Sequence, residues 1–152
     1  MSEALEKIIK EKISADHLLY VSMKYTKTCD VMINLLKRWK IMIDYTFDGL
    51  LEKGKKKKMI KQIPDAPKLR VDTIRKAFHD QKEVMDALEV YEMFKLIDIL
   101  NKTKEGEFRK GVCLRVTYKK EEIPINLEKL KEYAEILERF INYAKLFLLS
   151  KP

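Results

Sequence analysis

A chain of 152 residues with 46% apolar and 37% charged residues can bury one core, which excludes a disordered chain and two ordinary domains. The four glycines and four prolines exclude a fold with many tight turns and favour long helices. The formal net charge of +8 is local, because residues 53–61 hold six lysines and no acid. We therefore expect a single domain over residues 1–152 with one strongly basic segment.

No segment of the sequence has the pattern of an export signal or a membrane span. Residues 1–12 contain acidic and basic residues from the start and no apolar run, so we expect no secretory signal, and no stretch approaches about eighteen uncharged apolar residues. We therefore expect a soluble, cytoplasmic protein with no membrane partner. The abundance of Lys, Glu and Ile, with only two Gln, resembles the composition of thermophile proteins.

The first third of the chain predicts two helices. Ser2 is predicted to cap a short amphipathic helix that ends near Ser14. After it, uncharged residues recur at alternating steps of four and three, which indicates one long helix over residues 15–53 with a wide buried stripe. The members of this stripe are Leu18, Ser22, Tyr25, Cys29, Met32, Leu36, Trp39, Ile43, Thr46 and Leu50.

This predicted helix is long for a compact chain. It would measure about 58 Å, whereas a compact chain of this size is about 38 Å across. We expect an elongated bundle, a kink at Gly49, or an overhang covered by a second subunit, and we predict a homodimer. Gly54 is predicted to be the left-handed residue that ends the helix.

Two further helices are predicted after the basic segment. Asp65 is predicted to cap the first, with Pro67 in its first turn, and this helix ends about His79. Asp80, followed three residues later by Glu83, has the pattern of a second N-cap. The apolar residues of that helix are Val84, Leu88, Tyr91, Phe94, Ile97 and Leu100.

The last part of the chain begins with a change of period. Residues 112–118 alternate apolar and polar, and "KKEE" then turns into "IPIN", which predicts a small β-hairpin near residues 112–125 with Pro124 on an edge strand. Asn126 is predicted to cap a final helix with a second apolar seam that includes Leu137. The predicted fold class is mainly all-α: an up-and-down helical bundle of about five helices with one small β-hairpin.

The sequence lacks the motifs of common cofactor and metal sites. No glycine-rich phosphate loop occurs, and the two histidines have no metal-binding spacing, so we expect no cofactor and no metal. Cys29 and Cys113 suggest neither a zinc site nor a disulfide framework and are predicted to be reduced thiols. Cys29 is assigned to packing on the buried stripe, whereas the role of Cys113, beside Arg115, stays open.

Few side chains qualify for catalysis. The candidates for a catalytic pair are Arg75 and His79, one helical turn apart at a helix junction, and the alternative is that His79 is an exposed junction residue. His17 is assigned to a helix edge. Trp39 and Tyr25 belong to the stripe, so core packing is favoured over base stacking.

The basic segment is the main functional signal. Its lysines would attract phosphates without reading a base sequence, and the patch consists of Lys55, Lys56, Lys57, Lys58 and Lys61. The alternative is a solvated hinge, since lysines after a helix C-terminus suit the helix dipole and keep a loop soluble. No aromatic or Arg residue is interleaved in the run, as stacking on bases would require.

The order of parts resembles archaeal helical bundles of the HEPN type. The resemblance is carried by "KYTKTCDVMINLLKRWKIMID" in the long helix, a proline-bearing linker, two further helices and the closing "NLEKLKEYAEILERFINYA". HEPN domains are commonly dimeric; some cleave RNA with an Arg and a His that are separated by four to six intervening residues, and others bind nucleotides or accompany a small nucleotidyltransferase. Here three residues separate Arg75 from His79 and eight separate Arg70 from His79, so the cleavage motif is absent. The resemblance implies a dimeric bundle that contacts RNA or a protein partner.

We therefore expect a self-associating, non-enzymatic bundle that contacts an acidic partner, such as RNA or an acidic protein. The first alternative is a ribonuclease or nucleotide-handling enzyme of the HEPN class that uses Arg75 and His79. The second alternative is a structural adaptor protein, which would expose a large apolar patch.

Overall fold

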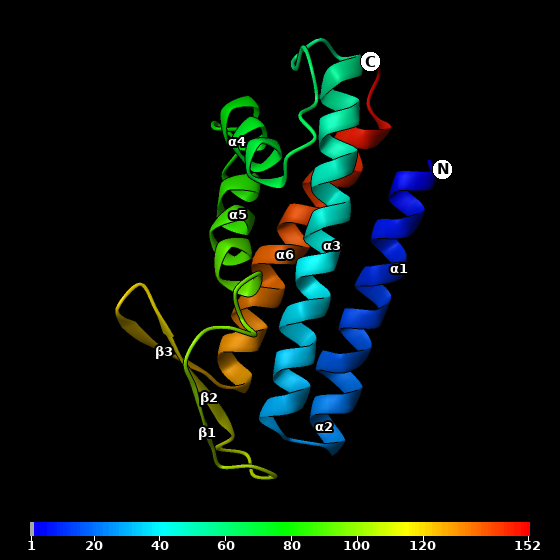
Figure 1. The fold of residues 1–152 in the computed structure, drawn as a ribbon. Helices are drawn as coiled ribbons and strands as arrows, with labels where there is room; N and C mark the ends of the chain where they lie inside the picture. The colour runs from blue at the N-terminus through cyan, green and yellow to red at the C-terminus, as the bar shows by residue number, and fades with distance from the viewer. Residues whose placement is uncertain (1) are drawn as a thin grey trace.

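Long helices lie side by side in the computed structural model, which describes residues 2–152 (Figure 1). The first is α1 (Glu3–His17), which continues through a π-helical turn, η1 (Leu18–Ser22), into the short α2 (Met23–Tyr25). The other helices are α3 (Cys29–Lys56), α4 (Pro67–Ala77), α5 (Lys82–Phe94) and α6 (Leu127–Leu149). Three strands, β1 (Lys102–Glu105), β2 (Cys113–Tyr118) and β3 (Glu121–Ile125), form an antiparallel sheet in that order. The predicted mainly-α class is confirmed.

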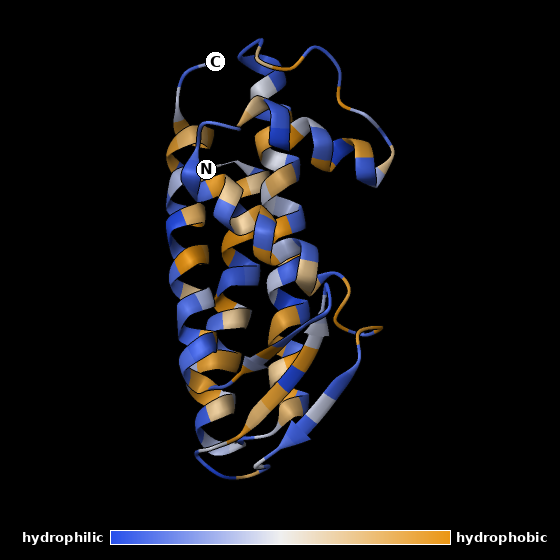
Figure 2. Ribbon diagram, turned by 90° about the vertical axis from the view of Figure 1, so that its left-hand side faces the viewer, coloured by the Kyte–Doolittle hydropathy of each residue, from blue (hydrophilic) through white to orange (hydrophobic). Residues whose placement is uncertain are grey.

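The core forms around α3, which contacts α1, α4, α5 and α6. Hydrophobic and hydrophilic residues alternate along these helices, as the amphipathic pattern requires (Figure 2). Trp39 on α3 is 3% exposed and Leu137 on α6 is 2% exposed, so the middle of each predicted apolar seam is buried. Trp39 stacks on Phe94 of α5 at 5.9 Å between ring centroids and meets the edge of Tyr133 of α6. These aromatic contacts tie three helices together.

The sheet extends the predicted hairpin by one strand. In β2, Leu114 and Val116 are fully buried, and they pair with Ile125 and Ile123 of β3. Pro124 lies on β3, which is an edge strand as predicted. The strand β1 was not predicted, because its sequence "KTKE" contains no apolar residue and so has no alternation to detect.

The prediction of one continuous helix over residues 15–53 is wrong. The chain leaves the helical conformation at Thr26, and Thr28 then caps α3, its side chain accepting a hydrogen bond from the Val31 N–H at 3.3 Å. The first predicted helix also extends past Ser14, through His17 into η1. The turn lets α1 and α3 pack side by side (Figure 1).

Two further expectations about the long helix also need correction. Tyr25, assigned to the buried stripe, is 77% exposed because it lies at the turn. The kink at Gly49, one of the three alternatives for the long helix, does not occur, since Gly49 is a buried residue inside the uninterrupted helix α3.

Gly54 does not end α3 as predicted. The left-handed residue is Lys58, with φ of 65°, and Gly54 lies within the helix. The Met59 N–H donates to the Gly54 carbonyl at 2.9 Å and the Lys58 N–H donates to the Lys55 carbonyl at 3.0 Å, which closes the last turn. Gly54 is needed for space instead, because a Cβ there would lie 2.8 Å from Cδ1 of Ile60, which folds back onto the helix.

The predicted caps of α4 and α5 are each displaced by one residue. Ala66 rather than Asp65 is the N-cap of α4, and Gln81 rather than Asp80 is that of α5, neither with a side-chain cap bond. Pro67 begins α4 as predicted. The α5 helix ends at Phe94, where turns replace the predicted continuation to Leu100. The Asn126 cap of α6 is confirmed, since its Oδ1 accepts a hydrogen bond from the Lys129 N–H at 2.8 Å.

Candidate nucleic-acid interface

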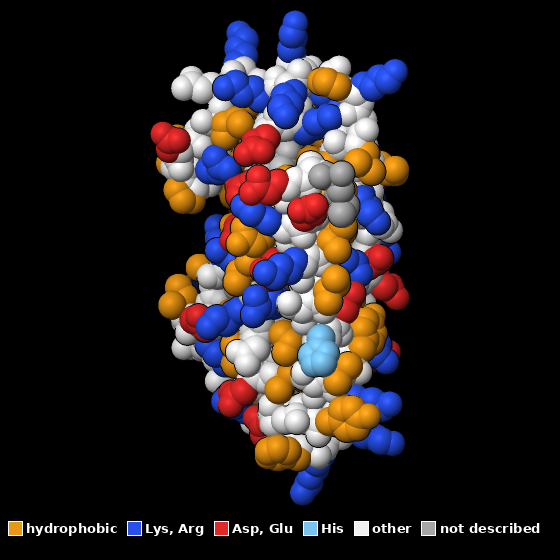
Figure 3. All heavy atoms as spheres, turned by 90° about the vertical axis from the view of Figure 1, so that its right-hand side faces the viewer, with side chains coloured by type: hydrophobic (Ala, Val, Ile, Leu, Met, Phe, Trp, Pro, Cys, Tyr) orange, Lys and Arg blue, Asp and Glu red, His pale blue; other side chains and the backbone are white. Residues whose placement is uncertain are grey.

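The predicted lysines gather where α3 ends. We call this surface the lysine end; it consists of Lys53, Lys55, Lys56, Lys57, Lys58 and Lys61. Four of the six are exposed, and Lys53 and Lys57 are half-buried. Figure 3 shows Lys and Arg side chains gathered at this end of the molecule. The structure therefore presents the basic segment as one outward-facing surface.

No carboxylate neutralises the lysine end. Within residues 2–152, none of its six ammonium groups lies within 4.0 Å of a carboxylate oxygen, whereas Lys40 and Lys82, for example, pair with Asp44 and Asp86. The C-terminal carbonyls of α3 favour a nearby cation through the helix dipole, but this effect falls off within the last turn. Lys58 and Lys61 lie beyond that turn, so their charges have no such compensation.

Lys57 differs from its neighbours because it has a structural contact. Its Nζ donates a hydrogen bond to the carbonyl of Lys151 at 2.8 Å and lies 5.3 Å from the centroid of the Phe147 ring. These contacts fasten the loop after α3 to the end of α6. Lys57 therefore holds the surface in place while the exposed lysines face solvent.

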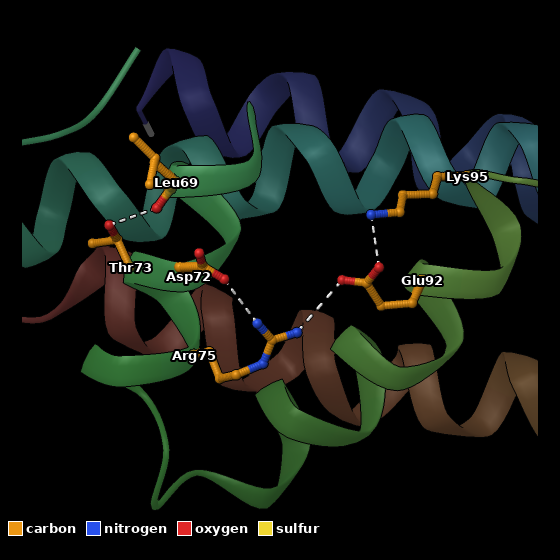
Figure 4. A network of polar contacts seen from close by, with 6 residues as sticks. All are labelled: Leu69, Asp72, Thr73, Arg75, Glu92 and Lys95. Carbon is orange, nitrogen blue, oxygen red and sulfur yellow. Dashed lines mark hydrogen bonds and ion pairs between the residues drawn. The ribbon is translucent and has the colours of Figure 1, made fainter. Parts of the chain in front are cut away.

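The predicted catalytic candidate Arg75 lies in a network of ion pairs on α4 and α5 (Figure 4). Its guanidinium donates to Asp72 Oδ1 at 3.0 Å and to Glu92 Oε1 at 3.5 Å. Lys95 Nζ reaches the same Glu92 at 2.6 Å. In the same view, Thr73 donates its hydroxyl proton to the Leu69 carbonyl at 2.8 Å. Arg75 thus links α4 to α5 and is already bound by two carboxylates.

His79 is exposed after the end of α4, as the alternative interpretation expected. Its Nδ1 lies 3.0 Å from the carbonyl oxygen of Lys76. No hydrogen bond joins His79 to Arg75 in the part of the chain that the structure describes. The two side chains are therefore not brought together as an acid–base pair. His17 is likewise an exposed residue at the end of α1.

Both cysteines are free thiols, and both are buried. Cys29 Sγ donates to the carbonyl of Cys113 at 3.4 Å, and the Cys29 N–H donates to the Glu107 carboxylate at 3.1 Å. Burial raises the pKa of Cys29 to about 11, and the charge of Glu107 also raises it. The Cys29 thiol therefore stays protonated at neutral pH, which fits the predicted packing role.

The grooves of the molecule are lined by charges of both signs, only some of which are paired with each other. One, of about 850 Å³, lies between α5, the turn after β2 and α6. Another, of about 300 Å³ between α1, α3 and α6, is crossed by Lys12, which pairs with Asp16 at 2.8 Å and Glu138 at 2.9 Å. Residues 2–152 contain no group of three or more His, Cys, Asp or Glu side chains arranged to hold a metal ion.

Among the described residues, no helix has the length and apolar character that crossing a membrane requires.

A second basic surface was not predicted from the sequence. We call it the aromatic end; it consists of Lys24, Tyr25, Lys27, Phe108, Arg109 and Lys110. The available signal was the alternation of aromatic and basic residues in "KYTK" and "FRK", but Tyr25 fitted the apolar stripe of the predicted long helix. The contact that joins the two segments is a hydrogen bond from the Phe108 N–H to the Lys27 carbonyl at 2.7 Å.

Comparison of the chain with protein-family models, with curated proteins and with solved structures finds no match.

Proposed function

We propose that the protein is a non-enzymatic module that binds RNA through its lysine end. The observation that carries the proposal is a group of four exposed lysines near the end of α3 that have no carboxylate partner among residues 2–152. Lys55, Lys56, Lys58 and Lys61 contact phosphates in this proposal, and Lys57 positions the loop.

The physical basis is the release of counterions from the nucleic acid. Each lysine that neutralises a phosphate releases condensed cations, so affinity falls steeply as the salt concentration rises. Lysine ammonium groups act as point charges and lack the planar fork with which arginine reads a guanine edge. The lysine end should therefore bind RNA without preference for a base sequence.

The scaffold in this proposal is an up-and-down helical bundle. In its support, α1 and α3 pack against each other along their length, and α5 and α6 pack against each other beside them (Figure 1). The Lys57 contact with the end of α6 keeps the loop after α3 attached to this scaffold. Binding therefore needs little ordering of the protein, although the long lysine side chains still lose freedom.

The test compares two double variants that lose the same charge. Lys55 and Lys56 are changed to Ser in one, and the exposed, unpaired Lys10 and Lys131 of α1 and α6 in the other. Filter binding of labelled RNA is measured between about 50 mM and about 200 mM salt. Loss of two phosphate contacts should lower the slope of log affinity against log salt by about 1.4 in the first variant, and the second should keep the wild-type slope.

Equal slopes for the two variants would contradict the proposal, because binding would then depend on net charge alone. The labelled RNA is also examined for cleavage, which the proposal expects to be absent. His79→Ala should leave both binding and the intact RNA unchanged.

A further inference from the structure

We infer that the aromatic end binds single-stranded RNA through its bases, which stack on Tyr25 and Phe108 while Arg109 and Lys110 hold the adjoining phosphates. The inference deepens the proposed function, on which it rests for the choice of RNA as the partner. It adds a base contact at the opposite end of the molecule from the lysine end (Figure 1).

The two segments of the aromatic end are held as one surface. Besides the bond from the Phe108 N–H to the Lys27 carbonyl, the Glu107 carboxylate accepts the Cys29 N–H at 3.1 Å. Lys104 Nζ also pairs with Asp30 Oδ1 at 2.7 Å. The loop after β1 is thus fixed next to the start of α3 by contacts of Lys104, Glu107 and Phe108 itself, so the surface is formed before a ligand arrives.

Both aromatic rings face solvent, and the backbone of Phe108 is strained in the conformation that exposes its ring. Tyr25 is 77% exposed and Phe108 is 75% exposed, so neither ring serves the core. Phe108 has φ of 67°, a left-handed conformation that costs on the order of 1–3 kcal/mol for a residue that is not glycine. Glycine would allow the same turn with less strain, as Gly106 does with φ of 62°. A phenylalanine at this position can stack on a base, which glycine cannot do. Such stacking contributes about 1–3 kcal/mol per base, which is comparable to the strain.

The positive charges around the two rings favour a nucleic acid, which carries phosphates, over an uncharged apolar partner. Lys24, Lys27, Arg109 and Lys110 have no carboxylate within 4.0 Å among residues 2–152. The acids nearby are already engaged: Asp30 with Lys104, Glu105 with Arg115, and Glu107 with the Cys29 N–H. Exposed aromatic rings beside uncompensated cations are what single-strand binding surfaces require. The lysine end offers cations without this interleaving.

The helix α3 fixes the distance between the two ends. It begins at Cys29 beside the aromatic end and finishes at Lys56 in the lysine end, so its 28 residues span about 40 Å. A single strand of about 12 nucleotides would cover that length if its phosphates lay about 3.4 Å apart, as they do along one strand of B-DNA. One strand could then contact both ends and gain affinity from the linkage.

The experiment measures binding of two labelled strands of about 12 nucleotides by fluorescence anisotropy. One is oligouridine, and the other is an abasic strand with the same number of phosphates. The variant Tyr25→Ala/Phe108→Ala should bind oligouridine at least about tenfold more weakly, because stacking is lost. Its affinity for the abasic strand and its salt dependence should stay at the wild-type level.

Two further variants separate stacking from folding. Tyr25→Phe/Phe108→Tyr keeps both rings and should retain the affinity for oligouridine. Ile99→Ala/Leu146→Ala removes side chains that are 77% and 75% exposed elsewhere on the surface, and it should bind as the wild type does. Thermal unfolding followed by circular dichroism confirms that each variant is folded.

The outcomes distinguish this inference from the proposed function. Unchanged oligouridine binding by Tyr25→Ala/Phe108→Ala, while Lys55→Ser/Lys56→Ser still weakens it, would overturn only the base-stacking inference. The reverse result would overturn only the role of the lysine end. A wild-type protein that binds neither strand overturns both. If the alanine variant instead lowers the mass of a dimer and leaves RNA binding unchanged, the surface is a protein contact and the inference fails.

Discussion

Lys58 holds a left-handed backbone conformation at the end of α3, with φ of 65°. Glycine is common at this position because it has no Cβ to clash. Lys119 and Lys120 adopt the same region in the turn after β2, so lysine in this conformation is not itself a mark of binding. The lysine end thus includes one residue whose backbone is less favourable than that of glycine.

Lys58→Gly should therefore raise the free energy of unfolding by about 0.5 kcal/mol, since relief of strain exceeds the added entropy of the unfolded chain. The same change should weaken RNA binding, because one cation is lost. Urea unfolding and filter binding measure the two effects. Lys53→Gly, inside α3, is the control and should lower stability by about 1 kcal/mol. A less stable Lys58→Gly protein would contradict the assigned strain.

Gly54 and Gly49 provide a matched pair inside α3. Alanine is the better helix former at both by about 1 kcal/mol. A Cβ at Gly49 would lie 3.4 Å from Leu148, an ordinary contact, but one at Gly54 would lie 2.8 Å from Cδ1 of Ile60. Gly49→Ala should thus be neutral or stabilising, and Gly54→Ala should lower the free energy of unfolding.

A double variant checks the cause of that loss. Ile60→Val removes Cδ1, which should cost about 1 kcal/mol in the wild-type background and less in the Gly54→Ala background. Denaturant unfolding of the four proteins gives the coupling energy. Additive effects would show that Gly54 and Ile60 do not conflict in the way described.

Tyr133 on α6 is 5% exposed, and burial, with a smaller contribution from Glu132, raises its pKa to about 12. The folded-state pKa is above the ordinary value of about 10, so the stabilisation from the neutral phenol is complete below about pH 10 and is lost as pH rises towards 12. Tyr133→Phe cannot ionise. Its free energy of unfolding should match the wild type near pH 7 and exceed it by about 1 kcal/mol near pH 11. Urea unfolding at the two pH values tests this, with Tyr20→Phe at an exposed position as the control.

The starts of α6 and α4 differ in their caps. Asn126 accepts the Lys129 N–H at 2.8 Å, whereas Ala66 at the start of α4 has no side chain that can accept. Asn126→Ala should cost about 1 kcal/mol, and Ala66→Ser should add up to about 1 kcal/mol. Thermal unfolding by calorimetry measures both changes. A stability gain from Asn126→Ala would show that its cap bond contributes nothing.

The helices could be predicted from the sequence where periodicity and a cap agree, as at α6 with Asn126. The break between α2 and α3 could not, because Leu18 and Ser22 continue the four-and-three pattern of the Cys29–Leu50 stripe across a change of direction. Hydrophobic periodicity indicates which side of each helix is apolar, but it does not indicate that two helices fold back on each other. The strand β1 could not be predicted for a related reason, since "KTKE" forms a strand only through its pairing with β2.

One part of the candidate site could be predicted from the sequence and the other could not. The lysine end is contiguous in sequence, so composition alone located it. The aromatic end joins residues 24–27 to residues 108–110 through the Phe108 bond to Lys27, a tertiary contact that no local pattern encodes. Tyr25 was assigned to the core because its exposure depends on the turn at Thr26.

The whole molecule no longer supports the length argument for a homodimer. That argument relied on a continuous helix over residues 15–53, and the chain instead turns before α3. The homodimer stays a prediction, for which exposed apolar side chains of α1 and η1, such as Ile13 at 65% and Tyr20 at 59%, would provide a surface. Light scattering should give twice the chain mass of 18.1 kDa, and a mass of 18.1 kDa would contradict the prediction.

The bond from Lys57 to the Lys151 carbonyl places the last residues of the chain against the loop after α3. A purification tag or fluorescent protein joined after Pro152 would occupy the space in front of that loop. Such a fusion would shield the neighbouring ammonium groups and understate their affinity for a polyanion. Reporter dyes are better attached at Ile99, whose side chain is 77% exposed and belongs to neither end.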